Sequence, residues 1–584
     1  MLETLSRRTT KSARLLRIHP AYFNKKVGWL GLFLAGVGWA LYQAGLFQGQ
    51  LINPGGWPLA ARFLQAALQP ELSGQFLQLT GQATLVTLAF AVCGIFLSLI
   101  LGVGGGILAS EVWWQSLVSP QRQALFRGPW LAFRSLLASL RAVHEIIWGL
   151  IFVNIIGLDP LSAILAIAIP FGAITAKVYS EILDETPRHA FTALRNSGAS
   201  TAKAFAYTLL PQALRDWLSY GFYHFECAIR AAAVLGIIGA GGLGHQIFLS
   251  FQTLKYQQIW TLFYALFLLN GLVDFCSSLL RRRLGRQINC SDSRDWVTIN
   301  RPGGRSGDPP GHDPALKWSL VMALLLIPFS FWYVQPDYSR LVSARTWQNL
   351  LTVLQFSLPP DFAVVGWSAW LELAQTTLAM SLLAVAGAGL VGLFFSFPAA
   401  NNFLLPGGLL DLGRGSKWQA ILGTVILLLT RFLLLVWRSI PPPIWALIFL
   451  FVLFPGILPG AMALGLYTLG VLGRLMAEVT ENLDDRPLTA LKSQGAGGGQ
   501  LFSYGVLPTT MPRFIAYFLY RWEETIRATV VIGLVGAGGL GWLLLERLSA
   551  FDYQGVAAAL LVFVAIIFVV DLISAAARRA FREG

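Results

Sequence analysis

Long apolar stretches alternate with short polar ones along the chain, and most of the apolar stretches have the length of a membrane-spanning helix. About 20 residues of helix cover the ~30 Å hydrocarbon core of a bilayer, because each residue adds 1.5 Å. The stretches lie near 28–48, 80–108, 135–157, 160–180, 217–243 and 257–280, and again near 317–334, 368–398, 418–440, 443–476, 514–541 and 555–576. The stretch 443–476 is interrupted by Pro and Gly, which leaves open whether it forms one helix or two. The pattern predicts an all-α polytopic membrane protein.

Composition agrees with this class, since 55% of the 584 residues are hydrophobic and only 12% are charged. Lysine and arginine outnumber the acidic residues by 43 to 29, and they cluster between the apolar stretches. Basic clusters precede the first stretch, follow the sixth at 281–286 and close the chain at 578–582. By the positive-inside rule we expect these clusters, and therefore both termini, on the cytoplasmic side of the membrane. The basic excess thus predicts topology rather than nucleic-acid binding.

Polar segments divide the chain into parts. The N-terminal tail lacks the apolar core and cleavage site of a secretory signal, so we expect it to be retained. A stretch dense in Asp, Ser, Gly and Pro predicts a flexible cytoplasmic linker. The expected parts are the tail 1–27, a first domain 28–283, the linker 284–316 and a second domain 317–584, with external connectors at 49–79 and 335–367.

The two halves are copies of one module. Residues 181–244 align without a gap on 478–541 when 297 is added to each number, and about two dozen aligned positions are identical. The same offset carries Arg141 onto Arg438, and upstream of these residues it drifts to 293. A period near 300 residues is far longer than a solenoid repeat, so two whole domains have been joined in one chain.

Charged residues inside the apolar stretches are candidates for a pathway through the membrane. Arg141 and Arg438 are costly there unless they face a polar cavity or a partner. After Arg438 comes Pro441-Pro442-Pro443, which breaks the helix, and the first half has Val143-His144-Glu145 instead, so the halves differ chemically. Glu226 with Arg230, and Glu523 with Arg527, are spaced i,i+4 and predict ion pairs. These pairs have either a purely structural role or an additional contact with a passing anion.

The sequence gives no indication of a metal site or of a disulfide bond. The four cysteines, at 93, 227, 276 and 290, have no paired spacing, and three lie in apolar stretches. The histidines show no ligand spacing, so we expect neither a metal site nor catalytic residues.

Two short polar segments carry a repeated signature. Thr192-Ala193-Leu194, Gly198 and Pro211 recur at identical spacing as Thr489-Ala490-Leu491, Gly495 and Pro508. The signature resembles the cytoplasmic loop of ATP-binding-cassette importer permeases, although both copies have Thr where that family has Glu. The resemblance implies that these residues form the loop that couples the chain to an ATPase subunit.

A second signature is more specific. It comprises Tyr223, Glu226, Arg230 and a glycine-rich run, repeated with Tyr520, Glu523 and Arg527, and it is similar to the permease subunit of phosphonate importers, whose relatives carry phosphite and other phosphorus oxyanions. The glycine-rich run either packs helices or forms a gate or hinge. Its candidate residues are Gly239, Gly241, Gly242 and Gly244, with Gly536, Gly538, Gly539 and Gly541 in the second copy.

The resemblance implies a permease that works with two cytoplasmic ATPase subunits and an extracytoplasmic binding protein. No G-x4-G-K-[ST] phosphate loop occurs in the sequence, so ATP and Mg²⁺ belong to the separate subunits and this chain is expected to bind no cofactor. Gly239 to Gly244 satisfies G-x-G-x-x-G but ends a membrane stretch, which argues against dinucleotide binding. The predicted function is transport of a phosphorus oxyanion through two fused permease domains. The alternatives are import of another small solute, a secondary transporter and a membrane enzyme.

Overall fold

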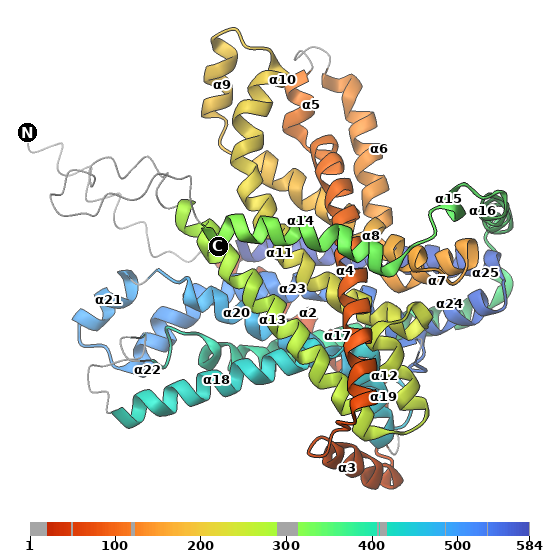
Figure 1. The fold of residues 1–584 in the computed structure, drawn as a ribbon. Coiled ribbons are helices and arrows are strands. Elements are labelled where there is room, and N and C mark those ends of the chain that lie inside the picture. Colours follow the sequence, from red (N-terminus) through yellow and green to blue (C-terminus); the bar gives the residue numbers. More distant parts are fainter. Residues whose placement is uncertain are drawn as a thin grey trace, which may run out of the picture.

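The computed structural model describes residues 20–47, 51–117, 123–288, 314–405, 408, 417–484, 486–533 and 535–582. Within these ranges the chain is helical, and the sole β-type pairing among them is an isolated bridge between Ile52 and Leu453. Figure 1 shows the helices as long rods from both halves that cross near the centre of the molecule. The predicted all-α polytopic class is confirmed.

The first half runs from α2 to α13. Its main helices are α2 (Pro20–Gln43), α3 (Trp57–Ala66), α4 (Gly74–Ala109), α5 (Glu111–Leu117), α6 (Gln123–Ala142), α7 (Glu145–Ile156), α8 (Pro160–Glu185), α9 (His189–Asn196), α10 (Thr201–Ala204), α11 (Leu210–Leu235), α12 (Gly242–Gln252) and α13 (Tyr256–Ile288). Short π-helical turns, η3 (Phe205–Leu209) and η4 (Gly236–Ala240), lie at the two ends of α11.

The second half repeats this order from α14 to α25. Its helices are α14 (Pro314–Val334), α15 (Ser339–Val342), α16 (Ala344–Phe356), α17 (Trp367–Ala399), α18 (Lys417–Ser439), α19 (Pro442–Val452), α20 (Ile457–Glu481), α21 (Arg486–Ser493), α22 (Gly498–Gln500), α23 (Leu507–Gly533), α24 (Gly539–Ser549) and α25 (Tyr553–Arg582). The stretch 443–476 therefore forms two helices, α19 and α20. Most of the expected linker, and the tail before Pro20, lie outside the described residues.

Eight of the described helices are long and apolar enough to cross a membrane. The expected single span 135–157 is instead the end of α6 followed by α7, bent by 89°. The bend occurs at His144, whose extended backbone ends one helix while its ring accepts a hydrogen bond from Ile146 N to cap the next. Counted as one broken span, this pair brings the number to nine.

The first helix of each half packs against the other half. Helix α2 contacts α17, with the rings of Phe33 and Phe518 of α23 edge to face at 5.3 Å. Helix α14 contacts α4, with Phe96 and Phe331 in a similar arrangement at 6.1 Å. The two repeats are therefore interlocked, and neither buries all of its apolar surface by itself.

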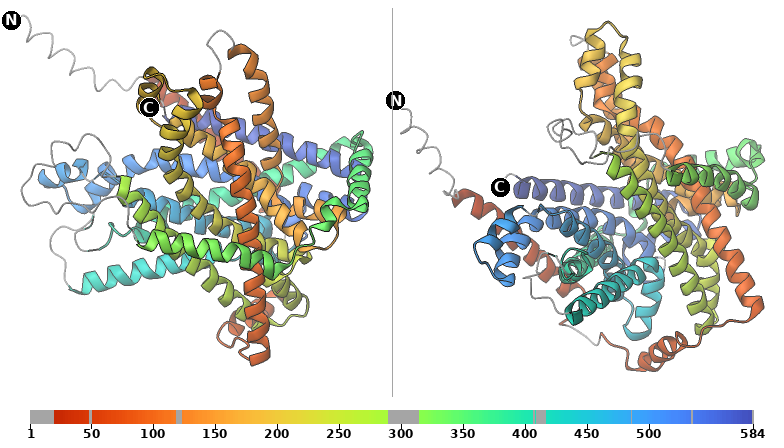
Figure 2. Two further views of the ribbon diagram at one scale, coloured as in Figure 1. Left: turned by 45° about the horizontal axis from the view of Figure 1, so that its top comes forward. Right: turned by 60° about the vertical axis from the view of Figure 1, so that its left-hand side comes forward.

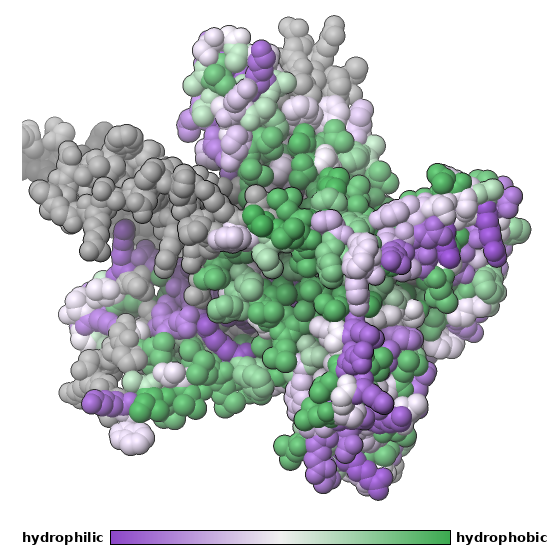
Figure 3. Space-filling view, in the orientation of Figure 1, coloured by the Kyte–Doolittle hydropathy of each residue, from purple (hydrophilic) through white to green (hydrophobic). Residues whose placement is uncertain are grey.

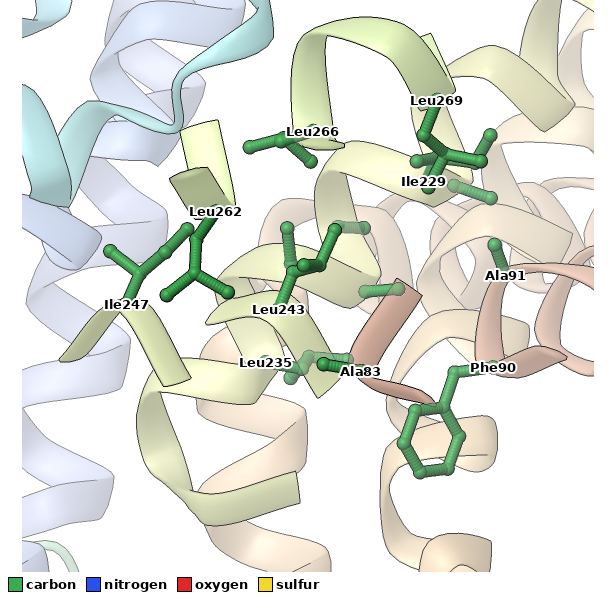
Figure 4. Packing of buried hydrophobic residues seen from close by; sticks show 14 of the residues in the cluster. Ala83, Phe90, Ala91, Ile229, Leu235, Leu243, Ile247, Leu262, Leu266 and Leu269 are labelled. Carbon is green, nitrogen blue, oxygen red and sulfur yellow. The ribbon is translucent and has the colours of Figure 1, made fainter. Parts of the chain in front are cut away.

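Buried side chains from several helices, mainly α4, α8, α11, α12 and α13, form the core of the first half. Figure 4 shows Ala83 and Phe90 of α4 near Leu235 of α11, Leu243 of α12 and Leu262 of α13. Lipid tails are as apolar as these side chains, so close van der Waals packing, rather than removal from water, stabilises this core within the membrane. Figure 3 shows hydrophobic side chains gathered over α14, α4 and α13, whereas hydrophilic ones gather near α3 and near α15 and α16.

The repeats place equivalent segments at separate ends of the molecule. In Figure 1, α9 and α10 lie at the top and α21 and α22 at the left, whereas α3 lies at the bottom and α15 and α16 at the right. The two views of Figure 2 show the same separation. The segments with the coupling-loop signature thus lie away from the segments predicted to be external connectors.

Candidate functional site

A cavity of about 160 Å³ lies at the centre of the molecule, between the two repeats. The first repeat lines it from α6, the α6–α7 break, α8 and α11, and the second from α19, α20 and α23. Its polar lining comprises Arg141, His144, Glu145, Tyr220, Tyr223, His224, Cys227 and Arg230 from the first repeat, and Tyr467, Tyr520, Arg521, Glu524 and Arg527 from the second.

Helical spacing explains why α11 and α23 supply most of this lining. Residues three, four and seven apart share one face of a helix. Positions 220, 223, 224, 227, 230, 231 and 234 follow this rule on α11, and positions 520, 521, 524, 527, 528 and 531 follow it on α23. Each repeat therefore turns one polar stripe of an otherwise apolar helix toward the other repeat.

The cavity is chemically asymmetric although the repeats are related by sequence. Tyr223 and Tyr520 are equivalent, as are Arg230 and Arg527, but His224 and Cys227 of the first repeat correspond to Arg521 and Glu524 of the second. The second repeat thus adds one more arginine and one glutamate to the lining.

Positive charge exceeds negative charge around the cavity. Four arginines line it, at 141, 230, 521 and 527, against two glutamates, at 145 and 524. The Nε atoms of Arg230 and Arg521 are buried and have no hydrogen-bond partner within the described part of the chain. A buried donor without a partner costs about 1–3 kcal/mol, so these groups favour an anion or water in the cavity.

One of the two predicted ion pairs is confirmed and the other is wrong. Arg230 Nη1 lies 3.2 Å from Glu226 Oε1. Arg527 instead contacts Glu524 at 2.5 Å, and Glu523 binds Arg578 of α25 at 2.5 Å. Two features account for the exchange. The second repeat has a glutamate at 524, inside the cavity, where the first has Cys227, and Arg578 of α25 binds Glu523.

Arg438, a sequence candidate for the pathway, lies beside the central cavity, where it forms ion pairs with two carboxylates. Its Nη1 lies 3.0 Å from Glu226 Oε1 and its Nη2 lies 2.7 Å from Asp274 Oδ2. These residues and Arg230 line a smaller cavity of about 40 Å³, and Tyr223 and Arg230 line both cavities. The equivalent Arg141 lines the central cavity, and its main-chain oxygen accepts a hydrogen bond from Arg527 Nη1 at 3.3 Å.

The two segments with the coupling-loop signature have the same local structure. Gly198 follows α9 with φ +91°, and Gly495 follows α21 with φ +81°, so each glycine takes a left-handed turn that other residues rarely adopt. A second short helix and a π-helical turn follow in each copy, η3 in the first and η7 (Leu501–Val506) in the second. Pro211 and Pro508 lie in the first turns of α11 and α23, so they begin the next helices rather than end the segments.

An equivalent pair of tyrosines lies exposed on these segments. Tyr207 is 78% exposed and Tyr504 is 77% exposed. Both repeats therefore leave a large aromatic side chain uncovered at the same place in this segment.

The glycine-rich runs form a tight turn between α11 and α12, and again between α23 and α24. A Cβ on Gly244 would lie 1.8 Å from the main-chain oxygen of Ala233, and one on Gly541 would lie 2.6 Å from that of Val530. Thr87 Oγ1 of α4 accepts a hydrogen bond from Leu243 N at 2.8 Å, and Thr377 Oγ1 of α17 accepts one from Leu540 N at 3.0 Å. Close helix packing is therefore one role of these glycines, and their role as gate or hinge stays a prediction.

The sequence patterns did not indicate several cavity residues, namely Arg521, Glu524, Tyr467 and His224. They also did not indicate that Tyr223 and Tyr520 face the cavity. Arg521 and Glu524 could have been predicted from their helical spacing to Arg527, because the three residues share one helix face. Tyr467 lies on another helix and corresponds to Pro170, so no pattern in the sequence indicated it. Among the described residues no cluster of His, Cys, Asp and Glu could hold a metal ion.

Comparison with known proteins places the chain among transport proteins. The family model described as binding-protein-dependent transport system inner membrane component matches residues 94–289 and again 418–583. A phosphate-import permease protein of Mycolicibacterium smegmatis is 25% identical over 501 residues, which cover 85% of this chain and 84% of that protein. A phosphite transport system permease protein of Stutzerimonas stutzeri is 35% identical over 271 residues, which cover 46% of this chain and 92% of that protein. No solved structure matches the chain significantly.

Proposed function

We propose that this chain, which belongs to the family of binding-protein-dependent transport system inner membrane components, imports a phosphorus oxyanion such as phosphonate, phosphite or phosphate. Two copies of the family's domain are fused in it. The names of the two relatives, a phosphate-import and a phosphite transport permease, support this class of substrate.

The charge of the central cavity is the main support for this proposal. Among the residues that line this space of about 160 Å³, four arginines against two glutamates give an excess of two positive charges, and Glu226 behind the lining balances the charge of Arg230. A guanidinium presents a planar fork of donors that fits two oxygens of a tetrahedral phosphorus anion at once. The unpartnered Nε atoms of Arg230 and Arg521 supply donors that such an anion satisfies while it passes.

Ion pairs made by two of the cavity arginines keep that contact weak. Glu524 binds Arg527 at 2.5 Å and Glu226 binds Arg230 at 3.2 Å, so each guanidinium has a competing carboxylate. A carboxylate that competes for the same donors lowers affinity for the anion. Weak binding suits a pathway, because an anion held too tightly would not leave.

Energy for import comes, in this proposal, from two copies of a cytoplasmic ATPase, which bind ATP and Mg²⁺. Residues 188–211 and 485–508 dock on them through the two short helices of each segment. Thr192, Ala193 and Gly198, with Thr489, Ala490 and Gly495, are the signature residues there, and the exposed Tyr207 and Tyr504 are the aromatic contacts. An extracytoplasmic binding protein delivers the substrate from the other side and sets much of the specificity.

The proposed topology places both termini, the linker and the coupling segments in the cytoplasm of a bacterium. Arg578 and Arg579 at the end of α25, and the arginines at 281–286 at the end of α13, lie at the positive-inside ends of their helices. The helices α3, α15 and α16 then lie outside.

A reconstituted system tests the proposal. Vesicles containing this chain, the ATPase and the binding protein should take up radiolabelled phosphate, phosphite or a simple phosphonate when ATP is present on the ATPase side. Sulfate serves as the matched tetrahedral control. Uptake driven by an ion gradient without the ATPase would instead favour a secondary transporter, and uptake of an unrelated solute would favour the other importer alternative.

A further inference from the structure

An apolar pocket of about 330 Å³ lies between the external helix α16, the start of α25 and helix α7 of the other repeat. It is separate from the central cavity and shares no residue with it. Its lining comprises Ile151, Asn154, Val353, Ser357, Leu358, Pro360, Leu548, Tyr553, Val556, Ala557, Leu560, Leu561 and Val564.

The same place in the first repeat has the same backbone arrangement. Glu71 N, after α3, donates a hydrogen bond to Gln257 O at the start of α13, at 3.3 Å. Asp361 N, after α16, donates one to Gln554 O at the start of α25, also at 3.3 Å. Helix α3 contacts α13 and α19, and α16 contacts α25 and α7, so the two external helices lie on equivalent partners.

In the first repeat, aromatic side chains fill this place. Trp260 Nε1 donates to Phe63 O at 2.7 Å, and Tyr264 Oη donates to Ala67 O at 2.7 Å. The rings of Phe63 and Trp260 lie 5.2 Å apart, and Trp260 contacts Tyr264 in turn. Helix α3 is therefore tied to α13 by both packing and hydrogen bonds.

The second repeat has smaller side chains at each of these positions. Trp260 and Tyr264 correspond to Ala557 and Leu561 by the offset of 297, and Phe63 corresponds to Val353 by the offset of 290 that relates the two external helices. Three aromatic rings are thus replaced by aliphatic groups while the backbone arrangement is kept. The pocket is the space that these rings would occupy.

The lining suits a hydrocarbon chain rather than a polar molecule. Asn154 Nδ2 donates to Leu150 O at 2.8 Å and Ser357 Oγ donates to Val353 O at 2.5 Å, so both amide and hydroxyl donors are engaged within their own helices. The remaining lining is aliphatic apart from Tyr553 and Pro360.

The pocket is continuous with the surface that the bilayer covers. Leu358 and Leu561 on its lining are 68% and 51% exposed, and Phe568 and Leu572 continue the exposed apolar surface along α25, one of the membrane-spanning helices. We propose that this pocket takes an acyl chain of a lipid from the leaflet opposite the coupling segments, which packs α16 against α25 as Trp260 and Tyr264 pack α3 against α13.

Photolabelling of the intact protein in vesicles tests this site. The vesicles contain phosphatidylethanolamine and phosphatidylglycerol with a trace of phosphatidylcholine that carries a diazirine on its acyl chain. We expect label on residues 548–564 and 353–360, and loss of that label in Ala557→Trp/Leu561→Tyr. Label at 568–572, which faces ordinary bilayer lipid, serves as the internal control and should not change.

The reverse substitutions, made in the first repeat, provide the matched variant. Trp260→Ala/Tyr264→Leu should open an equivalent pocket and gain label on residues 256–264. Leu561→Tyr alone narrows the pocket at its exposed side and serves if the double variant does not fold. Equal labelling of both repeats in the unchanged protein, or label at 548–564 that survives both filling variants, would overturn the proposal. None of these readouts depends on which solute is transported.

Discussion

Arg438 of the second repeat binds Glu226 of the first, with 3.0 Å between Arg438 Nη1 and Glu226 Oε1. The same guanidinium contacts Asp274, and Glu226 also contacts Arg230. Both Arg438 and Glu226 are buried. An ion cluster therefore joins the two repeats beside the central cavity, and it has no matching contact between Arg141 and Glu523 among the described residues.

Removing Arg438 should destabilise the protein strongly. Arg438→Ala leaves the buried Glu226 and the partly exposed Asp274 with one cation fewer. Breaking a buried ion pair from one side costs about 3–5 kcal/mol. We expect a clear fall in the thermal midpoint of the purified protein, measured by tryptophan fluorescence in detergent. Arg486→Ala is the matched control, because the side chains of Arg486 and its partner Asp484 are 94% and 68% exposed, and losing such an exposed ion pair should cost about 0–1 kcal/mol. Equal midpoints for the two variants would show that the cluster contributes little.

Arg527→Lys should impair uptake while keeping the charge. The lysine ammonium cannot contact Glu524, the Arg141 main-chain oxygen and a tetrahedral anion with the geometry of a guanidinium fork. We expect uptake at subsaturating substrate to fall about tenfold or more, which corresponds to about 1.4 kcal/mol or more. Glu523→Gln is the control, since Glu523 lies outside the central cavity and binds Arg578. It should lower stability and leave uptake nearly intact.

The double variant Arg230→Ala/Arg527→Ala tests the anion pathway most directly. It removes two of the four arginines that line the cavity and leaves the excess of positive charge at zero. Uptake by an assembled complex should then be lost. Full uptake would mean that these two arginines serve structure alone.

Gly198→Val and Gly495→Val should reduce the coupling of ATP hydrolysis to transport. A Cβ at either position meets no atom within 4 Å, so the cost comes from the positive φ, about 1–3 kcal/mol of local strain for a residue other than glycine. This strain should shift the short helices that follow, while the membrane-spanning helices assemble normally. Gly499→Ala is the control, because Gly499 has open space around it and no positive φ. Transport-stimulated ATP hydrolysis is the measurement, and unchanged coupling in both valine variants would count against docking at these segments.

Gly244→Ala and Gly541→Ala should disturb packing of the glycine-rich turns. Each new methyl group would overlap the backbone of the preceding helix, at Ala233 or Val530, and overpacking of this kind costs about 1–3 kcal/mol or more. We expect lower thermal midpoints and lower uptake. Gly104→Ala and Gly387→Ala, which meet nothing within 4 Å, should be neutral in the same assays.

One chain should supply the whole pathway. Both domains are present in it, and α2 and α14 each pack on the opposite repeat, so the two halves already bury the surfaces that separate permease chains would use to pair. Native mass spectrometry of the complex should find one copy per two ATPase subunits. Two copies would contradict this stoichiometry.

The sequence by itself determined the class, the repeat and the segments that carry the family's signatures. Apolar stretches of about 20 residues allow little besides membrane helices, because an unpaired backbone group is costly in hydrocarbon. Local chemistry likewise determined the turns at Gly198 and Gly495 and the break before Pro442, since backbone conformation at Gly and Pro depends mainly on the residue itself.

Only the tertiary structure decided which charged residues form ion pairs. By sequence spacing Arg527 could pair with Glu523 or with Glu524. It pairs with Glu524, because Glu523 binds Arg578 of α25, a separate helix. Arg438 and Arg141 are equivalent in sequence, yet Arg438 finds Glu226 and Asp274 across the interface whereas Arg141 lines the cavity. The pocket beside Ala557 likewise exists because helices far apart in the chain enclose it. Spacing along one helix predicts contacts within that helix, whereas partners on other helices follow from how the helices pack.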